Sequence, residues 1–175
     1  MAGPLGLDHD RFMALALAEA RRGARAEEVP VGAVLVDLGG TVLASAHNQT
    51  VTLNDPTAHA EVLALRRAAR RRGNYRLLNT VLYVTVEPCM MCMGAILHAR
   101  LTGLVFGAPD PRWGAAGSLF DLSADPRLNH RVTVVRGVRR EACGRLMQSF
   151  FRARRKGIDD FRFMIDDCGF QKSKI

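Results

Sequence analysis

Thr85-Val86-Glu87-Pro88-Cys89-Met90-Met91-Cys92 places two cysteines, three positions apart, just after an apolar run at residues 80–86. That run is typical of a buried strand, and residues 90–100, with no breaker except Gly94, are typical of a helix. Pro88 suits the first turn of such a helix, where its missing N–H is no loss. Residues three apart share one helix face, and a helix N-terminus lowers the pKa of thiols. The stretch therefore offers two thiolate ligands to one ion.

A Cys-x-x-Cys pair alone fits a redox pair or half of a structural zinc site equally well. His59-Ala60-Glu61, upstream on a separate apolar-periodic stretch, favours a different kind of site. His59 adds a third ligand to Cys89 and Cys92, which leaves the fourth position of a tetrahedral zinc ion for water. Three protein ligands plus water is the catalytic arrangement. We therefore predict one Zn²⁺ per subunit.

Composition narrows the class of protein. The chain has 175 residues, 48% of them hydrophobic, so we expect one domain around one core. A net charge of +8 predicts a polyanionic partner. Four cysteines, two of them in the motif, are too few for the disulfide framework of small secreted domains. We find no leader-like segment and no apolar run of about 18 residues, so we expect a cytoplasmic protein that does not use a membrane.

Hydrophobic periodicity and turn residues predict helices and strands that alternate along the chain. The expected helices are residues 8–25, 58–72, 90–100 and 141–155. The expected strands are residues 31–37, 41–47, 80–86, 101–107 and 131–136, with a long loop at 108–123. Strands separated by helices indicate a helix-flanked sheet in an α/β fold.

The C-terminal residues differ in composition from the rest. Residues 157–175 hold three of the four isoleucines and two of the three lysines, and their aspartates reverse the local charge. We therefore predict a main domain at residues 1–156 and an atypical tail at residues 157–175, to which we assign no function.

Glu61 has no place in a three-ligand site and so needs a role of its own. Zinc lowers the pKa of bound water to about 7, which gives hydroxide that can attack an electron-poor ring carbon bearing an amine. The ring and the departing amine then need a proton, and Glu61 lies two residues from a ligand. His-x-Glu with Pro-Cys-x-x-Cys is the signature of the zinc-dependent base deaminases. A structural zinc site is the alternative.

Longer stretches carry a family resemblance. HAE, TVEPCMMCMGAILHAR, VFGAPDP, GAAGS, EVPVGAV, DPTAHAE and Phe-Phe-Arg-x-Arg-Arg together resemble the bacterial tRNA-specific adenosine deaminases, from about residue 12 to residue 156. The resemblance implies a cytidine-deaminase-like three-layer α/β/α sandwich with a mixed central sheet of about five strands. It also implies a homodimer that acts on the anticodon stem-loop of an arginine tRNA and converts the wobble adenosine to inosine.

The resemblance also implies roles for individual residues. The zinc ligands are His59, Cys89 and Cys92, and Glu61 is the proton shuttle. Residues that bind the flipped-out nucleoside are Asn48, Pro30, Val31 and the backbone of Ala60. Asp110 matches a loop acid near the flanking nucleotide, where contact with a 2′-hydroxyl favours RNA. Trp113 departs from the small or polar residue expected in that loop, and it fits either stacking on a base or plugging a gap.

Two basic clusters are candidate RNA contacts. In the last helix, basic side chains lie beside two aromatic residues. Such a combination suits contacts with both the phosphate backbone and the bases of RNA. This RNA-binding set is Phe150, Phe151, Arg152, Arg154, Arg155 and Lys156. The arginine run at residues 66–72 fits a solvated helix face as well as an RNA face.

Two other functions use parts of the same pattern. A deaminase of a free base or nucleoside, of the guanine or cytosine type, shares HAE and PCxxC. The basic C-terminal helix, the GAAGS loop and the +8 charge speak against it. A catalytically silent, zinc-stabilised RNA-binding subunit is the second alternative, and such a subunit has no need of Glu61.

Overall fold

β3, Thr80–Val86, is the central strand, and each of its residues is buried. Side chains alternate between the two faces of a strand, so a strand that is buried throughout is covered on both faces. β3 pairs antiparallel with β1, Gly32–Asp37, and parallel with β4, Gly103–Ala108. β2, Val42–His47, and β5, Thr133–Arg136, complete a five-stranded mixed sheet in the order β2-β1-β3-β4-β5.

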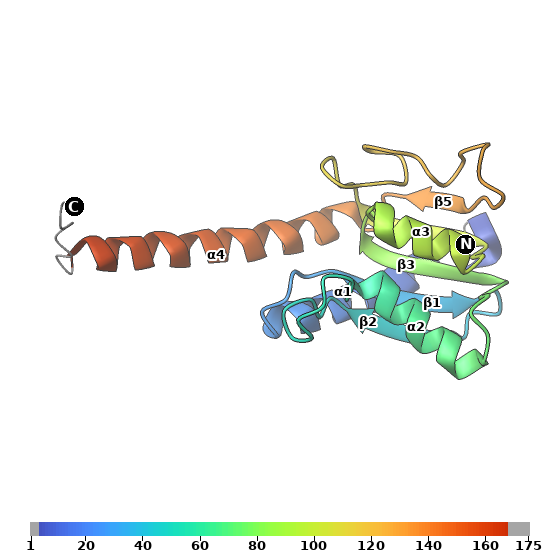
Figure 1. The fold of residues 1–175 in the computed structure, drawn as a ribbon, viewed down its shortest axis with the longest axis horizontal. Helices are drawn as coiled ribbons and strands as arrows, with labels where there is room; N and C mark the ends of the chain where they lie inside the picture. The colour runs from blue at the N-terminus through green and yellow to red at the C-terminus, as the bar shows by residue number, and fades with distance from the viewer. Residues whose placement is uncertain (1–3, 168–175) are drawn as a thin grey trace, which may run out of the picture.

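The computed structural model describes residues 4–167, and helices cover both faces of the sheet (Figure 1). The helical elements are the 3₁₀ turn Pro4–Gly6, α1 at His9–Arg25, α2 at Ala60–Arg72, α3 at Met90–His98 and α4 at Arg140–Asp167. Leu82 and Val84 of β3 belong to one apolar cluster with α2 and α3. Val81 and Tyr83 belong to a second cluster with α1 and the start of α4. The predicted three-layer α/β/α sandwich with five strands is confirmed.

The ends of the helices follow local chemistry. α1 begins after Asp8, whose carboxylate accepts a hydrogen bond of 3.0 Å from the backbone N–H of Arg11. α2 ends at Gly73, which adopts the left-handed conformation with φ 63°. The predicted bounds of these helices and of the strands agree with the structure to within about two residues. The 3₁₀ turn was not predicted.

α4 corrects the predicted end of the last helix. The helix was expected to stop at residue 155, but it continues to Asp167 and projects away from the sheet (Figure 1). A change in composition does not end a helix unless it brings a strong breaker, and Gly157 alone is tolerated. The predicted division at residues 156 and 157 therefore falls inside α4 and stays a prediction. Residues 168–175 of the predicted tail lie outside the described residues.

The arginine run of α2 protects an edge of the sheet. Arg67 donates a hydrogen bond of 2.5 Å to the carbonyl oxygen of Ser45, and Arg71 donates one of 3.3 Å to that of Leu43. Both carbonyls belong to the edge strand β2, where unpaired backbone groups invite pairing with another chain. These two arginines therefore have a structural role that neither interpretation of the sequence included.

Within residues 4–167, no helix is both long enough and apolar enough to cross a membrane.

Candidate active site

The two predicted metal-binding motifs meet because each begins a helix on the same face of the sheet. His59 is the N-cap of α2, and Cys89 is the N-cap of α3, directly after β3. Nδ1 of His59 lies 3.5 Å from Sγ of Cys92 and 3.8 Å from Sγ of Cys89. All three ligand atoms lie within 4.8 Å of one another, which is close enough for one metal ion.

The position of Pro88 differs from the prediction. Pro88 was expected in the first turn of the helix, but Cys89 occupies the N-cap, so the proline lies one residue before it. A sulfur at the N-cap is next to the free N–H groups of the first turn, which favour negative charge. A hydrogen bond from the Cys92 thiol, with help from His59, lowers the pKa of Cys89 to about 4.

Glu61 lies beside this cluster in the first turn of α2 and is 3% exposed. Burial raises the pKa of its carboxyl group. Its Oε2 atom is buried and makes no hydrogen bond to any group within residues 4–167. Buried polar atoms normally have a hydrogen-bond partner, and a ligand bound at the cluster would be the partner of this oxygen. One nitrogen and two sulfur donors suit zinc, so the residues present fit the predicted ion.

The predicted base-binding residues lie next to the cluster. Oδ1 of Asn48 accepts a hydrogen bond of 2.8 Å from the backbone N–H of Ala60, between His59 and Glu61. The backbone N–H of Asn48 in turn donates to the carbonyl oxygen of Val31 at 3.2 Å. Pro30 is buried immediately before Val31. The structure therefore brings these four residues together, while their contacts with a base stay predictions.

Asp110 and Trp113 lie in the loop between β4 and β5. Oδ1 of Asp110 accepts hydrogen bonds from the backbone N–H groups of Arg112 at 2.9 Å and Trp113 at 3.2 Å. Trp113 is 62% exposed, so it does not plug a gap in the described chain. Stacking of its side chain on a base stays a prediction.

The predicted RNA-binding residues lie along α4. Phe151, Arg152, Arg154 and Arg155 are exposed, and Phe150 is half-buried. The guanidinium of Arg154 lies 4.9 Å from the centre of the Phe150 ring and donates a hydrogen bond of 2.6 Å to the carbonyl oxygen of Glu27. This bond attaches the basic part of α4 to the segment that leads into Pro30. Lys156 follows in the same helix.

Sequence reasoning missed two buried carboxylates. Glu28 is fully buried and accepts hydrogen bonds from Thr50 and from the backbone of Val51 and Thr52, in the loop after Asn48. Glu87, 3% exposed, accepts four hydrogen bonds from the loop that carries Asp110. Glu28 directly precedes an apolar run and Glu87 directly follows one, which is the one signal the sequence contains.

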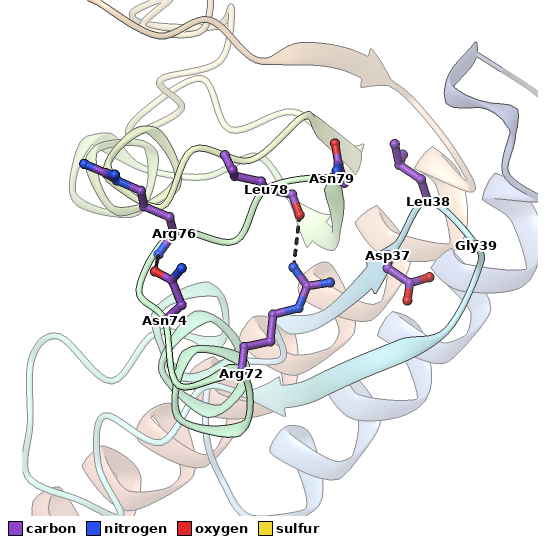
Figure 2. Close-up of a pocket in the computed structure, with 8 residues that line it drawn as sticks. All are labelled: Asp37, Leu38, Gly39, Arg72, Asn74, Arg76, Leu78 and Asn79. Carbon is purple, nitrogen blue, oxygen red and sulfur yellow. Dashed lines mark hydrogen bonds between the residues drawn. The ribbon is translucent and has the colours of Figure 1, made fainter.

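A pocket at the far end of α2 is not part of this site. Figure 2 shows it between the β1–β2 turn and the segment after α2, with Arg72 donating a hydrogen bond of 3.0 Å to the carbonyl oxygen of Leu78. None of the predicted site residues lines it. The C-terminal end of a helix favours cations, so Arg72 stabilises the end of α2 and, through its bond to Leu78, the segment that follows.

Comparisons with known proteins identify the family. A family model described as MafB19-like deaminase matches residues 7–155. The tRNA-specific adenosine deaminase of Haemophilus influenzae is 47% identical over 147 residues, which cover 84% of this chain and 85% of the relative. The chain belongs to the tRNA-specific adenosine deaminase family.

Solved structures agree with membership of the tRNA-specific adenosine deaminase family. A structure from studies of A-to-I editing by tRNA:A34 deaminases at the wobble position of transfer RNA matches with a TM-score of 0.75. It is 43% identical and covers 78% of this chain and 98% of its own. The guanine deaminase of Bacillus subtilis matches with a TM-score of 0.56 and 41% identity, over 59% of this chain and 66% of that one.

Proposed function

We propose that this chain is a zinc-dependent hydrolase that converts the wobble adenosine of an arginine tRNA anticodon to inosine. One observation carries the proposal. In a chain 47% identical to a tRNA-specific adenosine deaminase, a buried carboxylate with an unpartnered oxygen lies beside a His/Cys/Cys cluster. The reaction consumes water and releases ammonia, so it needs a group that moves protons at this place.

The proposed ligands of the ion are His59, Cys89 and Cys92. Zinc in such a site lowers the pKa of a coordinated water to about 7 and so makes it a nucleophile at neutral pH. Glu61 would take one proton from the attacking water and give it to the ring nitrogen. It would then take the proton of the hydroxyl added to the ring carbon and give it to the amine, which leaves as ammonia when the C–N bond breaks. Burial raises the pKa of Glu61, and a raised pKa suits a group that must both accept and donate a proton near neutrality.

The remaining residues bind and orient the nucleotide. The target adenosine must leave the stack to reach the site, as in other enzymes that modify bases. Oδ1 of Asn48 accepts the N–H of Ala60, and we assign the contact with the nucleoside to the amide nitrogen of Asn48. Pro30 and Val31 line the base, and Asp110 faces the 2′-hydroxyl of the flanking nucleotide.

We also propose that the chain works in the cytoplasm as a homodimer on the anticodon stem-loop. The support for a partner copy is the apolar surface beside the site. Met90 and Met91 at the start of α3 are 42% and 38% exposed, and Leu119 and Phe120 in the adjoining loop are 50% and 47% exposed. Contiguous exposed apolar residues mark interaction surfaces. The molar mass in solution, measured by sedimentation, tests this point.

Guanine deamination is the second candidate, since the guanine deaminase match has a similar identity over a smaller part of the chain. The test is to measure ammonia and inosine from an arginine-tRNA anticodon stem-loop, in parallel with free guanine, cytosine and adenosine. We expect release from the stem-loop alone. Activity on a free base without activity on the stem-loop would overturn the proposal.

A further inference from the structure

Glu87 is a buried carboxylate that the proposed chemistry does not use. It lies directly after β3 and is 3% exposed. Its Oε1 accepts hydrogen bonds from the backbone N–H groups of Ala116 at 3.0 Å and Ser118 at 2.9 Å. Its Oε2 accepts one from the backbone N–H of Asp110 at 3.0 Å and one from the Ser118 hydroxyl. Four donors from one loop therefore converge on one side chain.

A carboxylate is the side chain that this arrangement requires. An ionised carboxylate offers about four lone-pair sites and no donor, which matches four donors and no acceptor. Hydrogen bonds to a charged group are about twice as strong as neutral ones, and they offset the cost of burying the charge. An amide in place of Glu87 would direct two N–H groups at donors of the loop.

The same loop is also tied to the metal-binding turn by its backbone. The backbone N–H of Glu87 donates to the carbonyl oxygen of Ala108 at 2.8 Å, and that of Ala115 donates to the carbonyl oxygen of Pro88 at 2.8 Å. Gly114 packs so closely that a Cβ there would lie 2.5 Å from Oε2 of Glu87. Residues 108–118 therefore wrap around Glu87, one residue before Pro88 and two before Cys89.

We propose that Glu87 is a positioning residue that sets the conformation of the loop facing the RNA. Its bond to the backbone N–H of Asp110 fixes that residue, and the Asp110 carboxylate holds the backbone of Trp113. Glu87 thereby aims the Asp110 carboxylate and the exposed Trp113 ring at the nucleotide next to the target adenosine. The choice of RNA as ligand rests on the proposed function, whereas the control of the loop by Glu87 does not.

Trp113 reports on the loop directly because it is the one tryptophan in the chain. The experiment compares the wild type with Glu87→Gln, both loaded with zinc, by steady-state anisotropy and acrylamide quenching of tryptophan fluorescence. In Glu87→Gln, an NH2 group replaces one carboxylate oxygen and faces the donors of the loop. Because donors then face donors, the loop loosens. We expect lower anisotropy and stronger quenching, with zinc content and far-ultraviolet circular dichroism unchanged.

Glu28→Gln is the matched control. Glu28 is also a buried carboxylate that holds a loop through backbone N–H groups, but its loop is Thr50–Thr52. The same chemical change there lowers the melting temperature without changing the anisotropy or quenching of Trp113. A change in Trp113 with both variants would mean that general destabilisation, and not Glu87, loosens the loop.

The RNA readout separates positioning from chemistry. With the anticodon stem-loop as substrate, Glu87→Gln raises KM about 10- to 100-fold, the value of one charge-assisted hydrogen bond, and changes kcat much less. A fall in kcat with an unchanged KM would place Glu87 in the chemical step and would overturn the proposal. If the wild type deaminates no stem-loop, the proposed function fails, and the fluorescence comparison still tests the loop.

Ser118→Ala decides the matter if Glu87→Gln does not fold. It removes the hydroxyl donor and leaves Glu87 in place, and Ser118 is an exposed residue, so the fold should tolerate the change. We expect a smaller shift of the Trp113 signal in the same direction. Unchanged anisotropy and quenching in every folded variant would overturn the proposal.

Discussion

The amide oxygen of Asn48 accepts a hydrogen bond of 2.8 Å from the backbone N–H of Ala60. Asn48 follows β2, and Ala60 is the first residue of α2, between a predicted zinc ligand and the predicted proton shuttle. The bond therefore ties the predicted base pocket to the predicted metal site. It also leaves the amide nitrogen of Asn48 available as a donor to a nucleoside.

Asn48→Asp and Asn48→Ala should separate these two roles. Aspartate keeps an acceptor for the Ala60 N–H but removes the amide donor, so the fold survives and KM for the stem-loop rises about 10- to 100-fold. Alanine leaves a buried N–H unpartnered, which costs about 1–3 kcal/mol of unfolding free energy. For a chain of this size, each kcal/mol lowers the melting temperature by about 2–4 °C. Equal destabilisation by both variants would contradict this division of roles.

Glu61→Ala should remove activity and leave the metal in place. General acid–base catalysis contributes about a hundred- to ten-thousand-fold, and Glu61 serves several proton transfers, so we expect the upper end or beyond. The variant leaves the proposed zinc ligands His59, Cys89 and Cys92 unchanged. The measurement is elemental zinc, RNA binding and inosine formation on one preparation. Zinc lost together with activity would make Glu61 a ligand, and retained activity would remove it from the mechanism.

The His/Cys/Cys cluster could be predicted from sequence because each motif adjoins a strong structural signal. Cys89 and Cys92 come after an apolar run that becomes a fully buried strand, and His59 precedes an apolar-periodic helix. β2 and β3 run in the same direction because each is antiparallel to β1, so the helices that follow them begin at the same edge of the sheet. Short-range periodicity placed the three residues on their elements, and the pairing of His-x-Glu with Pro-Cys-x-x-Cys singled them out as candidate ligands.

Glu87 could not be predicted in this way. Its donors lie 23 to 31 residues further along the chain, and all but one are backbone N–H groups. Backbone groups leave no trace in a sequence. For the same reason, sequence analysis left the role of Arg67 and Arg71 open, since both donate to backbone carbonyls of β2.

The cysteines should differ in reactivity when the metal is removed. The pKa of Cys89 is lowered to about 4, so its thiolate is present above that pH and disappears only as the pH falls through about 4. Burial raises the pKa of Cys143 to about 11, which keeps it a thiol at neutral pH. After treatment with a chelator, iodoacetamide at about pH 6 should modify Cys89 and spare Cys143, because the thiolate is the nucleophile.

Peptide mass spectrometry resolves each site, and protein reloaded with zinc is the control. Zinc should protect Cys89 because its sulfur is then a ligand. Modification of Cys143 as fast as Cys89 in the folded, metal-free protein would show that the interior around α4 opens, contrary to the packing described. Unchanged modification of Cys89 on zinc loading would remove it from the ligand set.

The basic part of α4 should determine how RNA binding depends on salt. We predict that phosphates contact Arg154, Arg155 and Lys156. The side chain of Arg154 is held in place by its hydrogen bond to the carbonyl oxygen of Glu27. Replacing all three with alanine should weaken binding of the anticodon stem-loop. For every phosphate that the variant no longer neutralises, the slope of log affinity against log salt should become shallower by about 0.7 to 0.9.

Arg70→Ala, Arg71→Ala and Arg72→Ala, combined, make the matched control because they remove the same charge. They lie at the C-terminal end of α2, about 15–18 Å along the helix from its first residue, Ala60. If the arginines of α2 form a solvated face, the α2 variant should keep the slope of the wild type, while the α4 variant has a shallower one. A shallower slope in both triple variants would make the α2 arginines part of the RNA face. Binding is measured below the melting temperature of each variant, since Arg71 and Arg72 also make backbone hydrogen bonds. Equal slopes for the wild type and the α4 variant would place these charges away from the RNA.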